Sequence, residues 1–264
     1  NTAVGYLALA DNTTATGNDA FGDQALRLNT TGDNNVAIGR YSLNKNTTGA
    51  SNSAVGANAL NANTTASSNT AVGAYSLDAN TTASENTAFG RSSLTSNTTG
   101  EGNTAVGHDA LAGNTTASNC TAVGRNALTG NTTGATNIAI GGDSLHNCTT
   151  GNLNISIGYQ SSYNGVALTT GARNVILGHY AKTSGASNDY QNVIGYDVTG
   201  SGNNTFTFGN GSSDTTCSNG GTSWSAPSDE RLKKDITTST AGLSFINDLR
   251  PVTYKWKNEG DIPS

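Results

Sequence analysis

The residues of this chain that could carry out covalent chemistry lie close together near its C-terminal end. Ser228 is followed five residues later by Lys233, in the run Ser-Asp-Glu-Arg-Leu-Lys-Lys that spans residues 228–234. A serine hydroxyl needs a nearby base to become a nucleophile, and a lysine can act as that base where desolvation lowers its pKa. The same residues also fit a helix that is capped by Ser228 and carries solvated lysines. The local pattern leaves both interpretations open.

Residues 1–227 contain no comparable grouping. We assign His108, His146 and His179 to unrelated phases of the repeat described below, and no paired carboxylates recur there. The three cysteines, Cys120, Cys148 and Cys217, are too few and too scattered for a disulfide framework or a zinc site. We therefore expect no cofactor, no metal ion and no glycan-cleaving activity in residues 1–227.

Most of the chain is a strict repeat of seventeen residues. Its first copy begins Asn1-Thr2-Ala3-Val4-Gly5 and continues to Leu9 and Asn12-Thr13-Thr14. Its glycine recurs without insertion or deletion at Gly5, Gly22, Gly39, Gly56, Gly73, Gly90, Gly107, Gly124, Gly141 and Gly158. A fixed period of this length indicates a solenoid, in which each unit buries its apolar residues by stacking on its neighbours. Residues 1–160 are therefore predicted to form ten coils of an all-β, parallel β-roll, with two short strands and two turns per coil.

Two rows of the repeat receive opposite roles in this prediction. The large apolar residue before each glycine (Val4 in the first copy) and the leucine four residues after it (Leu9) are the expected core. The alanine two residues before each glycine, beginning with Ala3 and Ala20, forms a stripe of small residues on the opposite face. We expect neighbouring rods to pack on this stripe about a shared axis. Tight packing between the coils of one rod is the alternative.

The Asn-Thr-Thr segment of each repeat is typical of a turn, and it has three interpretations. Side-chain hydrogen bonds within the turns are the first. A hydroxyl array that orders water, as on ice-binding solenoids, is the second, and N-glycosylation at the Asn-Thr-Thr pattern is the third. Cys120 and Cys148 each stand where other repeats carry an asparagine. We interpret both as replacements within stacked polar rows.

The strict period ends after Gly158. The next comparable glycines are Gly178, Gly195 and Gly209, and tyrosines and phenylalanines become denser. Residues 161–208 are predicted to be irregular capping coils, whose tyrosines either pack the cap or form a sugar-binding surface. Residues 209–227 have the composition of a neck or linker. Residues 228–264 are predicted to be a short α/β segment.

Charge and hydropathy exclude several classes of partner. The formal net charge is -5 and no basic stripe follows the repeats, so nucleic-acid binding is not expected. No apolar run approaches the length of a membrane span, so membrane insertion is not expected either. The chain contains no methionine and begins inside a repeat, which indicates a fragment or a processed product.

The repeat resembles the head repeats of trimeric autotransporter adhesins. The resemblance covers residues 1 to about 160 and depends on the Asn-Thr-Ala-Val-Gly-x-x-Ala-Leu unit. It implies left-handed parallel β-rolls in threefold bundles, and similar repeats occur in the fibres of tailed bacteriophages. The seventeen-residue period is longer than the commonest repeat of the adhesin heads.

A second resemblance begins at Ser228. Two blocks, residues 228–236 and residues 249–256 (Leu-Arg-Pro-Val-Thr-Tyr-Lys-Trp), resemble the opening of the intramolecular chaperone autoprocessing domain of phage tail spikes and endosialidases. The resemblance implies that the domain trimerises the fibre and then cuts itself off between Ser228 and Asp229. Ser228 would be the nucleophile and Lys233 the general base. About thirty-seven residues follow the motif, whereas the family domain runs to roughly a hundred or more.

Together these features predict the distal part of a homotrimeric tail fibre of a tailed phage, located outside the cell on the virion. Its expected role is structural and adhesive, toward a host glycan or envelope receptor. A cellular trimeric surface adhesin is the first alternative, and an ice-binding or purely structural extracellular filament is the second.

Overall fold

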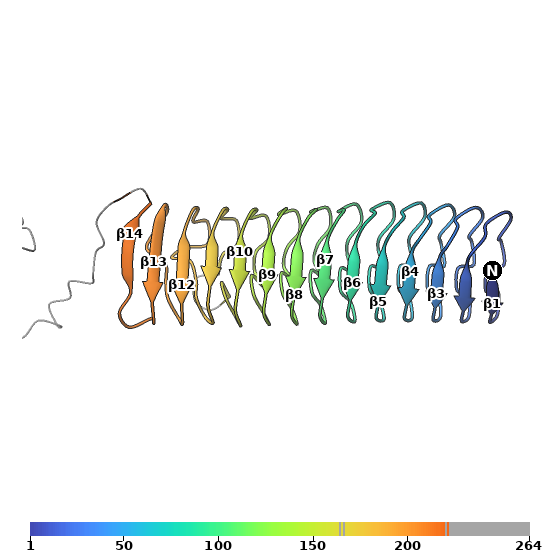
Figure 1. Ribbon diagram of the computed structural model, residues 1–264, viewed down its shortest axis with the longest axis horizontal. Helices are drawn as coiled ribbons and strands as arrows, with labels where there is room; N and C mark the ends of the chain where they lie inside the picture. Colours follow the sequence, from blue (N-terminus) through green and yellow to red (C-terminus); the bar gives the residue numbers. More distant parts are fainter. Residues whose placement is uncertain (164, 166, 220, 222–264) are drawn as a thin grey trace, which may run out of the picture. The chain divides into compact units, whose positions relative to one another are not determined.

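A computed structural model describes residues 1–163, 165, 167–219 and 221, all within one compact unit, Asn1–Pro227. Fourteen short strands form one sheet in chain order, as Figure 1 shows. The strands are β1 (Thr2–Val4), β2 (Asp19–Phe21), β3 (Val36–Ile38), β4 (Ser53–Val55), β5 (Thr70–Val72), β6 (Thr87–Phe89), β7 (Thr104–Val106), β8 (Thr121–Val123), β9 (Ile138–Ile140), β10 (Ile155–Ile157), β11 (Val175–Leu177), β12 (Asn192–Gly195), β13 (Thr205–Gly209) and β14 (Thr215–Ser218). The described residues contain no helix, and the predicted all-β parallel solenoid is confirmed.

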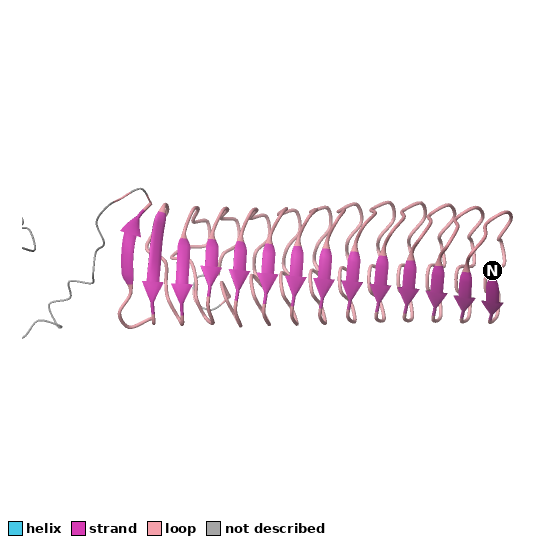
Figure 2. Cartoon of the chain, in the orientation of Figure 1, coloured by secondary structure: helices cyan, strands magenta, loops and turns pink. Residues whose placement is uncertain are grey.

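Each coil of the solenoid contributes one strand, and the coils stack in strict register. The parallel pairing of β1 with β2 joins Thr2 to Asp19, Ala3 to Ala20 and Val4 to Phe21, so equivalent repeat positions lie side by side. This pairing continues through β13, while the loops return behind the strands (Figure 2). Every position of the repeat therefore becomes a row along the solenoid axis.

The parallel stacking extends beyond residue 160, where the strict sequence period stops. The pairing offset is twenty residues between Ile155 of β10 and Val175 of β11, and seventeen residues between β11 and β12. It falls to fourteen between β12 and β13, where Asn192 pairs with Phe206. The loops therefore absorb the insertion and the shortening, while the strands keep their register.

Part of the predicted neck is a strand. Strand β14, within residues 209–227, pairs antiparallel with β13, from Thr205–Ser218 to Phe208–Thr215. Thr215 and Thr216 are β-branched and suit a strand. Strand β14 covers the edge of β13 that would otherwise expose unpaired backbone groups. The predicted α/β segment, residues 228–264, lies outside the described residues.

The prediction of which strand face is buried was wrong: the alanine face is buried, and the face with the larger residues is not. The alanine row is fully buried at Ala20, Ala37, Ala54, Ala71, Ala88, Ala105, Ala122 and Ala139, whereas the large residue before each glycine points outward. In the regular coils the alanine row and the leucine row form one core cluster, and where the leucine row has ended the larger Ile176 and Val193 occupy the alanine position and are buried. The alternative of tight packing within one rod is therefore the one that the structure supports. The predicted leucine row is confirmed as core from Leu26 to Leu145.

The second apolar segment of each repeat is a turn, not the predicted strand. The leucine of this segment has a left-handed backbone, with φ of 51° at Leu26 and 48° at Leu43. This conformation directs the Leu26 N–H to the carbonyl of Ser42 in the next coil, at 2.9 Å. A left-handed leucine costs of order 1–2 kcal/mol. The buried side chain and the hydrogen bond between coils offset that cost.

Two rows of buried asparagines connect the coils, and we call them the asparagine ladders. In the first, the Asn35 N–H donates to Oδ1 of Asn18 at 2.9 Å, and the Asn35 side chain donates to the Gly49 carbonyl at 2.9 Å. In the second, Asn46 Nδ2 donates to Asn29 Oδ1 at 2.8 Å and to the Gly49 carbonyl at 2.9 Å. The interpretation of Asn-Thr-Thr as hydrogen-bonded turns is thereby confirmed. At positions such as Asn46, the side-chain nitrogen that a glycan would need already donates two hydrogen bonds inside the fold.

Candidate functional site

The residues predicted to carry out chemistry lie outside the described part of the chain. Ser228, Asp229 and Lys233 all fall within residues 222–264. Their arrangement therefore stays a prediction, and the candidate sites within the described residues are surfaces.

The described surface offers no enclosed site. No pocket is present among the described residues, and they contain no cluster of three histidine, cysteine or carboxylate side chains that could hold a metal ion. No helix long and apolar enough to cross a membrane occurs in that part of the chain.

The most extended candidate surface is the row that precedes the repeat glycines, which we call the outer apolar row. Its members are Val4, Phe21, Ile38, Val55, Val72, Phe89, Val106, Val123, Ile140, Ile157, Leu177, Ile194 and Phe208. Exposure reaches 56% at Val4 and 52% at Phe89, and the other members are exposed or partly exposed. Strand pairing places neighbours of the row side by side, as in Val4 with Phe21 and Ile194 with Phe208. Continuous apolar surfaces of this kind mark interaction sites.

The second candidate surface is the turn formed by the two residues after each repeat glycine, which we call the post-glycine edge. The opposite turn repeats Asn-Thr-Thr almost without change, whereas this edge varies from coil to coil. It carries Tyr6, Asp23, Gln24, Arg40, Tyr41, Tyr75, Arg91, His108, Asp109, Arg125, Asp143, Tyr159, His179, Tyr180, Tyr196 and Asp197. The assignment of the histidines to unrelated phases was wrong, because His108 and His179 both directly follow a repeat glycine.

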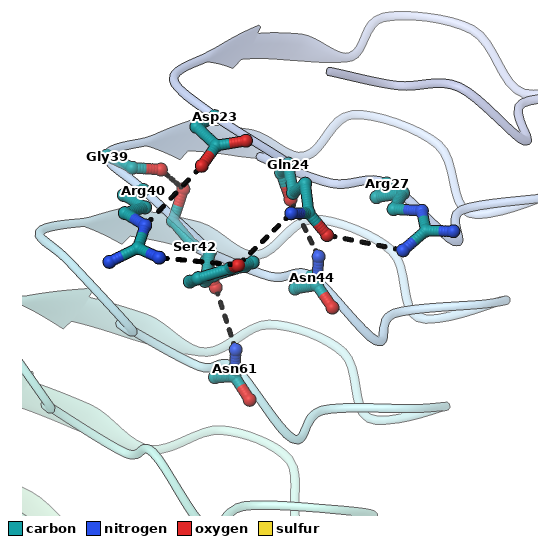
Figure 3. A network of polar contacts seen from close by, with 9 residues as sticks. Asp23, Gln24, Arg27, Gly39, Arg40, Ser42, Asn44 and Asn61 are labelled. Atoms are coloured by element: carbon teal, nitrogen blue, oxygen red, sulfur yellow. Dashed lines mark hydrogen bonds and ion pairs between the residues drawn. The ribbon is translucent and has the colours of Figure 1, made fainter. Parts of the chain in front are cut away.

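Polar contacts at the post-glycine edge run from coil to coil. Figure 3 shows one network, in which Arg40 Nε lies 3.4 Å from Asp23 Oδ2 and the Arg40 guanidinium lies over the Tyr41 ring, 4.5 Å from its centroid. The Tyr41 hydroxyl accepts hydrogen bonds from Gln24 Nε2 at 3.1 Å and Arg40 Nη2 at 3.4 Å. The Tyr41 contact, followed by that of Asp23, raises the pKa of Arg40. The guanidinium therefore stays charged, and the network holds it against the ring.

Further along the edge, the charged groups also contact one another. His108 Nδ1 lies 2.8 Å from Asp109 Oδ2, and Arg91 Nη1 lies 3.1 Å from His108 Nε2. Arg125 lies 3.4 Å from Asp143 Oδ2. The contacts Arg91–His108 and Arg125–Asp143 join adjacent coils, and carboxylates lie beside His108 and Arg125 along the edge.

The post-glycine edge becomes aromatic in the last parallel coils. Tyr159, Tyr180 and Tyr196 follow β10, β11 and β12, and their rings contact in sequence with centroids 5.8 Å apart at each step. The interplanar angles of 81° and 86° are those of edge-to-face packing. Exposure is 41% at Tyr159 and 60% at Tyr196, so the packed rings remain open to solvent. We call these three residues the tyrosine row.

The buried cysteines belong to the asparagine ladders. The Cys120 thiol donates to the Gly134 carbonyl at 3.3 Å, and the Cys120 N–H donates to Asn103 Oδ1 at 2.9 Å. Burial raises the pKa of Cys120, and it raises the pKa of Cys148 to about 12. Both thiols are therefore protonated at neutral pH and are poor nucleophiles. Both cysteines therefore replace an asparagine within a polar row, as predicted.

The described region is thus a parallel β-solenoid with an outer apolar row and a polar and aromatic edge. Residues 228–263 match a sequence model of the family described as chaperone of endosialidase. The match begins at Ser228, and it supports the resemblance noted for the C-terminal segment. No curated protein and no solved structure matches the chain.

Proposed function

We propose that this chain is the distal part of a homotrimeric tail fibre of a tailed phage, which adheres to a host surface and is assembled by a C-terminal chaperone that cleaves itself off. The observation that carries the proposal is the match of residues 228–263 to the chaperone of endosialidase directly after a β-solenoid with an uncovered apolar row. A solenoid of this kind supplies a stiff, extended body, because each coil is held by its neighbours.

The outer apolar row supports the homotrimeric part of the proposal. One large apolar side chain projects from every coil, at the repeat distance of paired strands, which is about 4.8 Å. A partner that covers the whole row must carry apolar groups with the same period. A second and a third copy of this chain, parallel and in register, meet that requirement by symmetry.

The chaperone segment would cleave between Ser228 and Asp229. In this proposal Lys233 accepts the proton of the Ser228 hydroxyl, and the hydroxyl oxygen attacks the carbonyl carbon of the Ser228–Asp229 peptide bond. The C–N bond breaks as Lys233 returns the proton to the Asp229 amine, which leaves an ester on the serine oxygen. One water molecule then hydrolyses this ester, giving a carboxylate on Ser228 and the free hydroxyl. A lysine is a competent base only where its pKa is lowered, which requires a desolvated site in the assembled trimer.

Two other functions differ from this proposal in testable ways. A cellular trimeric adhesin has the same kind of solenoid but would remain joined to the segment after Ser228. An ice-binding filament would use the exposed second threonine of each Asn-Thr-Thr turn, such as Thr31 and Thr48. A thermal-hysteresis assay separates that function from adhesion. The match at residues 228–263 favours the phage fibre.

The decisive experiment is native and denaturing mass spectrometry of the full-length gene product and of three variants. We expect the parent to be a trimer that has lost every residue after Ser228. Ser228→Ala and Lys233→Ala should remain uncleaved, whereas Lys234→Ala, the neighbouring control, should be cleaved like the parent.

An uncleaved monomer in the parent protein would overturn both the chaperone and the fibre. Cleavage that persists in Ser228→Ala would retain the fibre but reject the assigned nucleophile. If Lys234→Ala is not cleaved and Lys233→Ala is cleaved, the general base is Lys234 and not Lys233.

A further inference from the structure

The tyrosine row is the most concentrated group of exposed aromatic side chains on the post-glycine edge. Earlier tyrosines on this edge, Tyr6, Tyr41 and Tyr75, lie in coils that are not adjacent. Tyr159, Tyr180 and Tyr196 instead occupy three consecutive coils. Backbone hydrogen bonds between those coils hold the row in place. The Tyr180 N–H donates to the Tyr159 carbonyl at 3.1 Å, and the Asp197 N–H donates to the His179 carbonyl at 2.9 Å.

The rings of the tyrosine row pack together without becoming buried. Each ring meets the next edge to face, and His179 lies beside Tyr159 with its ring centroid 6.5 Å away. Rings that served only to pack a cap would be covered, yet Tyr196 is 60% exposed. Mutual packing instead fixes the orientation of rings whose remaining surface faces solvent, which lowers the entropic cost of binding a partner.

The hydroxyl groups of these tyrosines are available for hydrogen bonds. Within the described part of the chain, no residue is hydrogen-bonded to the hydroxyl of Tyr159, Tyr180 or Tyr196, whereas the Tyr41 hydroxyl has two partners. A tyrosine with an exposed ring and an open hydroxyl offers an apolar face and a polar tip to one ligand.

Charged groups beside the row neutralise each other. Lys182 Nζ lies 2.6 Å from Asp197 Oδ1, and Asp197 is 53% exposed. The pair presents a donor and an acceptor to solvent but has no net charge, and His179 is also exposed. Such a surface does not select an anionic or cationic ligand by its field.

We infer that the tyrosine row, with His179, Lys182 and Asp197, is a binding surface for a neutral oligosaccharide. A pyranose has an apolar face of C–H groups that stacks on an aromatic ring, and hydroxyl groups around its rim that require donors and acceptors. The row supplies both kinds of group. It extends over three coils without a pocket, which suits a chain of several sugar units rather than a single small molecule. This inference rests on the proposed adhesive function and assigns that function to the tyrosine row.

The test uses the mature trimeric fibre and an array of defined, immobilised neutral oligosaccharides built from glucose, galactose, rhamnose or N-acetylglucosamine. We expect the parent to bind at least one of them. Tyr196→Ala should raise the Kd of that oligosaccharide roughly ten-fold, which corresponds to about 1.4 kcal/mol. Tyr196→Phe should retain most of the stacking and lose less affinity.

The matched control is Tyr75→Ala. Tyr75 lies on the same edge, is 44% exposed and has the repeat phase of Tyr180, but it is many coils away from the row. We expect this variant to bind as the parent does. Native mass spectrometry of every variant should show an unchanged trimer.

The results that would contradict this inference can be distinguished from those that would contradict the proposed fibre. If the parent binds an oligosaccharide and Tyr196→Ala binds it equally well, adhesion is retained and the tyrosine row is rejected. If no oligosaccharide of the array binds to the parent, the saccharide surface is rejected while the cleavage and trimer assays still decide the fibre. A Tyr196→Ala variant that loses its trimer shows that a second copy covers the row, which also overturns the inference.

Discussion

At the scale of single residues, the asparagine ladders explain how a chain so poor in apolar residues folds. In the first ladder an asparagine connects neighbouring coils, as at Asn69, whose N–H donates to Asn52 Oδ1 and whose side chain donates to the Ala83 carbonyl. Buried polar groups stabilise a fold only where they are fully paired, and an unpaired one costs about 1–3 kcal/mol. Asn131 Oδ1 is without a partner, next to the position where Cys148 replaces the ladder asparagine.

Replacing Cys120 with asparagine should stabilise the solenoid by about 1 kcal/mol, because the ladder regains an amide between Asn103 and Asn137. The reverse change, Asn69→Cys, should destabilise it by about 1–3 kcal/mol, since Asn69 Oδ1 accepts the Asn86 N–H at 2.9 Å. Thermal unfolding followed by circular dichroism measures both. Equal melting temperatures for the two variants would show that the ladder asparagines do not stabilise the fold.

At the scale of the structural element, the repeat glycine decides how closely coils approach. Gly90 has a φ of 144°, and a Cβ atom placed on it would lie 2.4 Å from the carbonyl oxygen of Gly107. A residue with a side chain is strained at this backbone angle. The same geometry recurs at the other repeat glycines, which explains why this residue never varies from Gly5 to Gly158.

Gly90→Ala should therefore destabilise the solenoid by about 1–3 kcal/mol, since it places a side chain at a strained φ. Gly100→Ala is the control, because Ala66, Ala83 and Ala117 occupy the same repeat position in other coils. Chemical denaturation of the two variants measures the difference. Similar losses of stability in both would contradict a special role for the repeat glycine.

At the scale of the whole molecule, the outer apolar row gives each solenoid a continuous, partly exposed apolar surface, which the proposed trimer would cover. The double variant Phe89→Lys and Ile140→Lys should weaken trimer assembly by at least ten-fold, because each trimer would bring together six added charges in an apolar interface. The folded coils should persist, since both side chains are more than a third exposed.

The matched control carries the same charges on the opposite turn, as Thr82→Lys and Thr133→Lys, where both threonines are exposed. Analytical ultracentrifugation compares the two double variants. An outer-row variant that assembles like the control would reject this row as the interface between copies.

The sequence by itself determined the architecture, because a period of seventeen residues without insertions can only stack equivalent residues into rows. It also predicted the turn chemistry of Asn-Thr-Thr, the buried leucine row and the place of both ladder cysteines, since each depends on residue type at a constant phase. The segment that begins at Ser228 was identified from its own residues, and its chemistry stays a prediction.

Only the tertiary structure decided which face of each strand is inside. Alternation along Thr2-Ala3-Val4 shows that alanine and valine point in opposite directions, and hydrophobicity favours valine as the buried residue. In the regular coils a buried leucine shares the interior with the alanine, and the larger side chain before the glycine points outward. Where the leucine row has ended, Ile176 and Val193 occupy the alanine position and are fully buried. The regular arrangement includes left-handed leucines such as Leu26, a conformation that residue type does not predict.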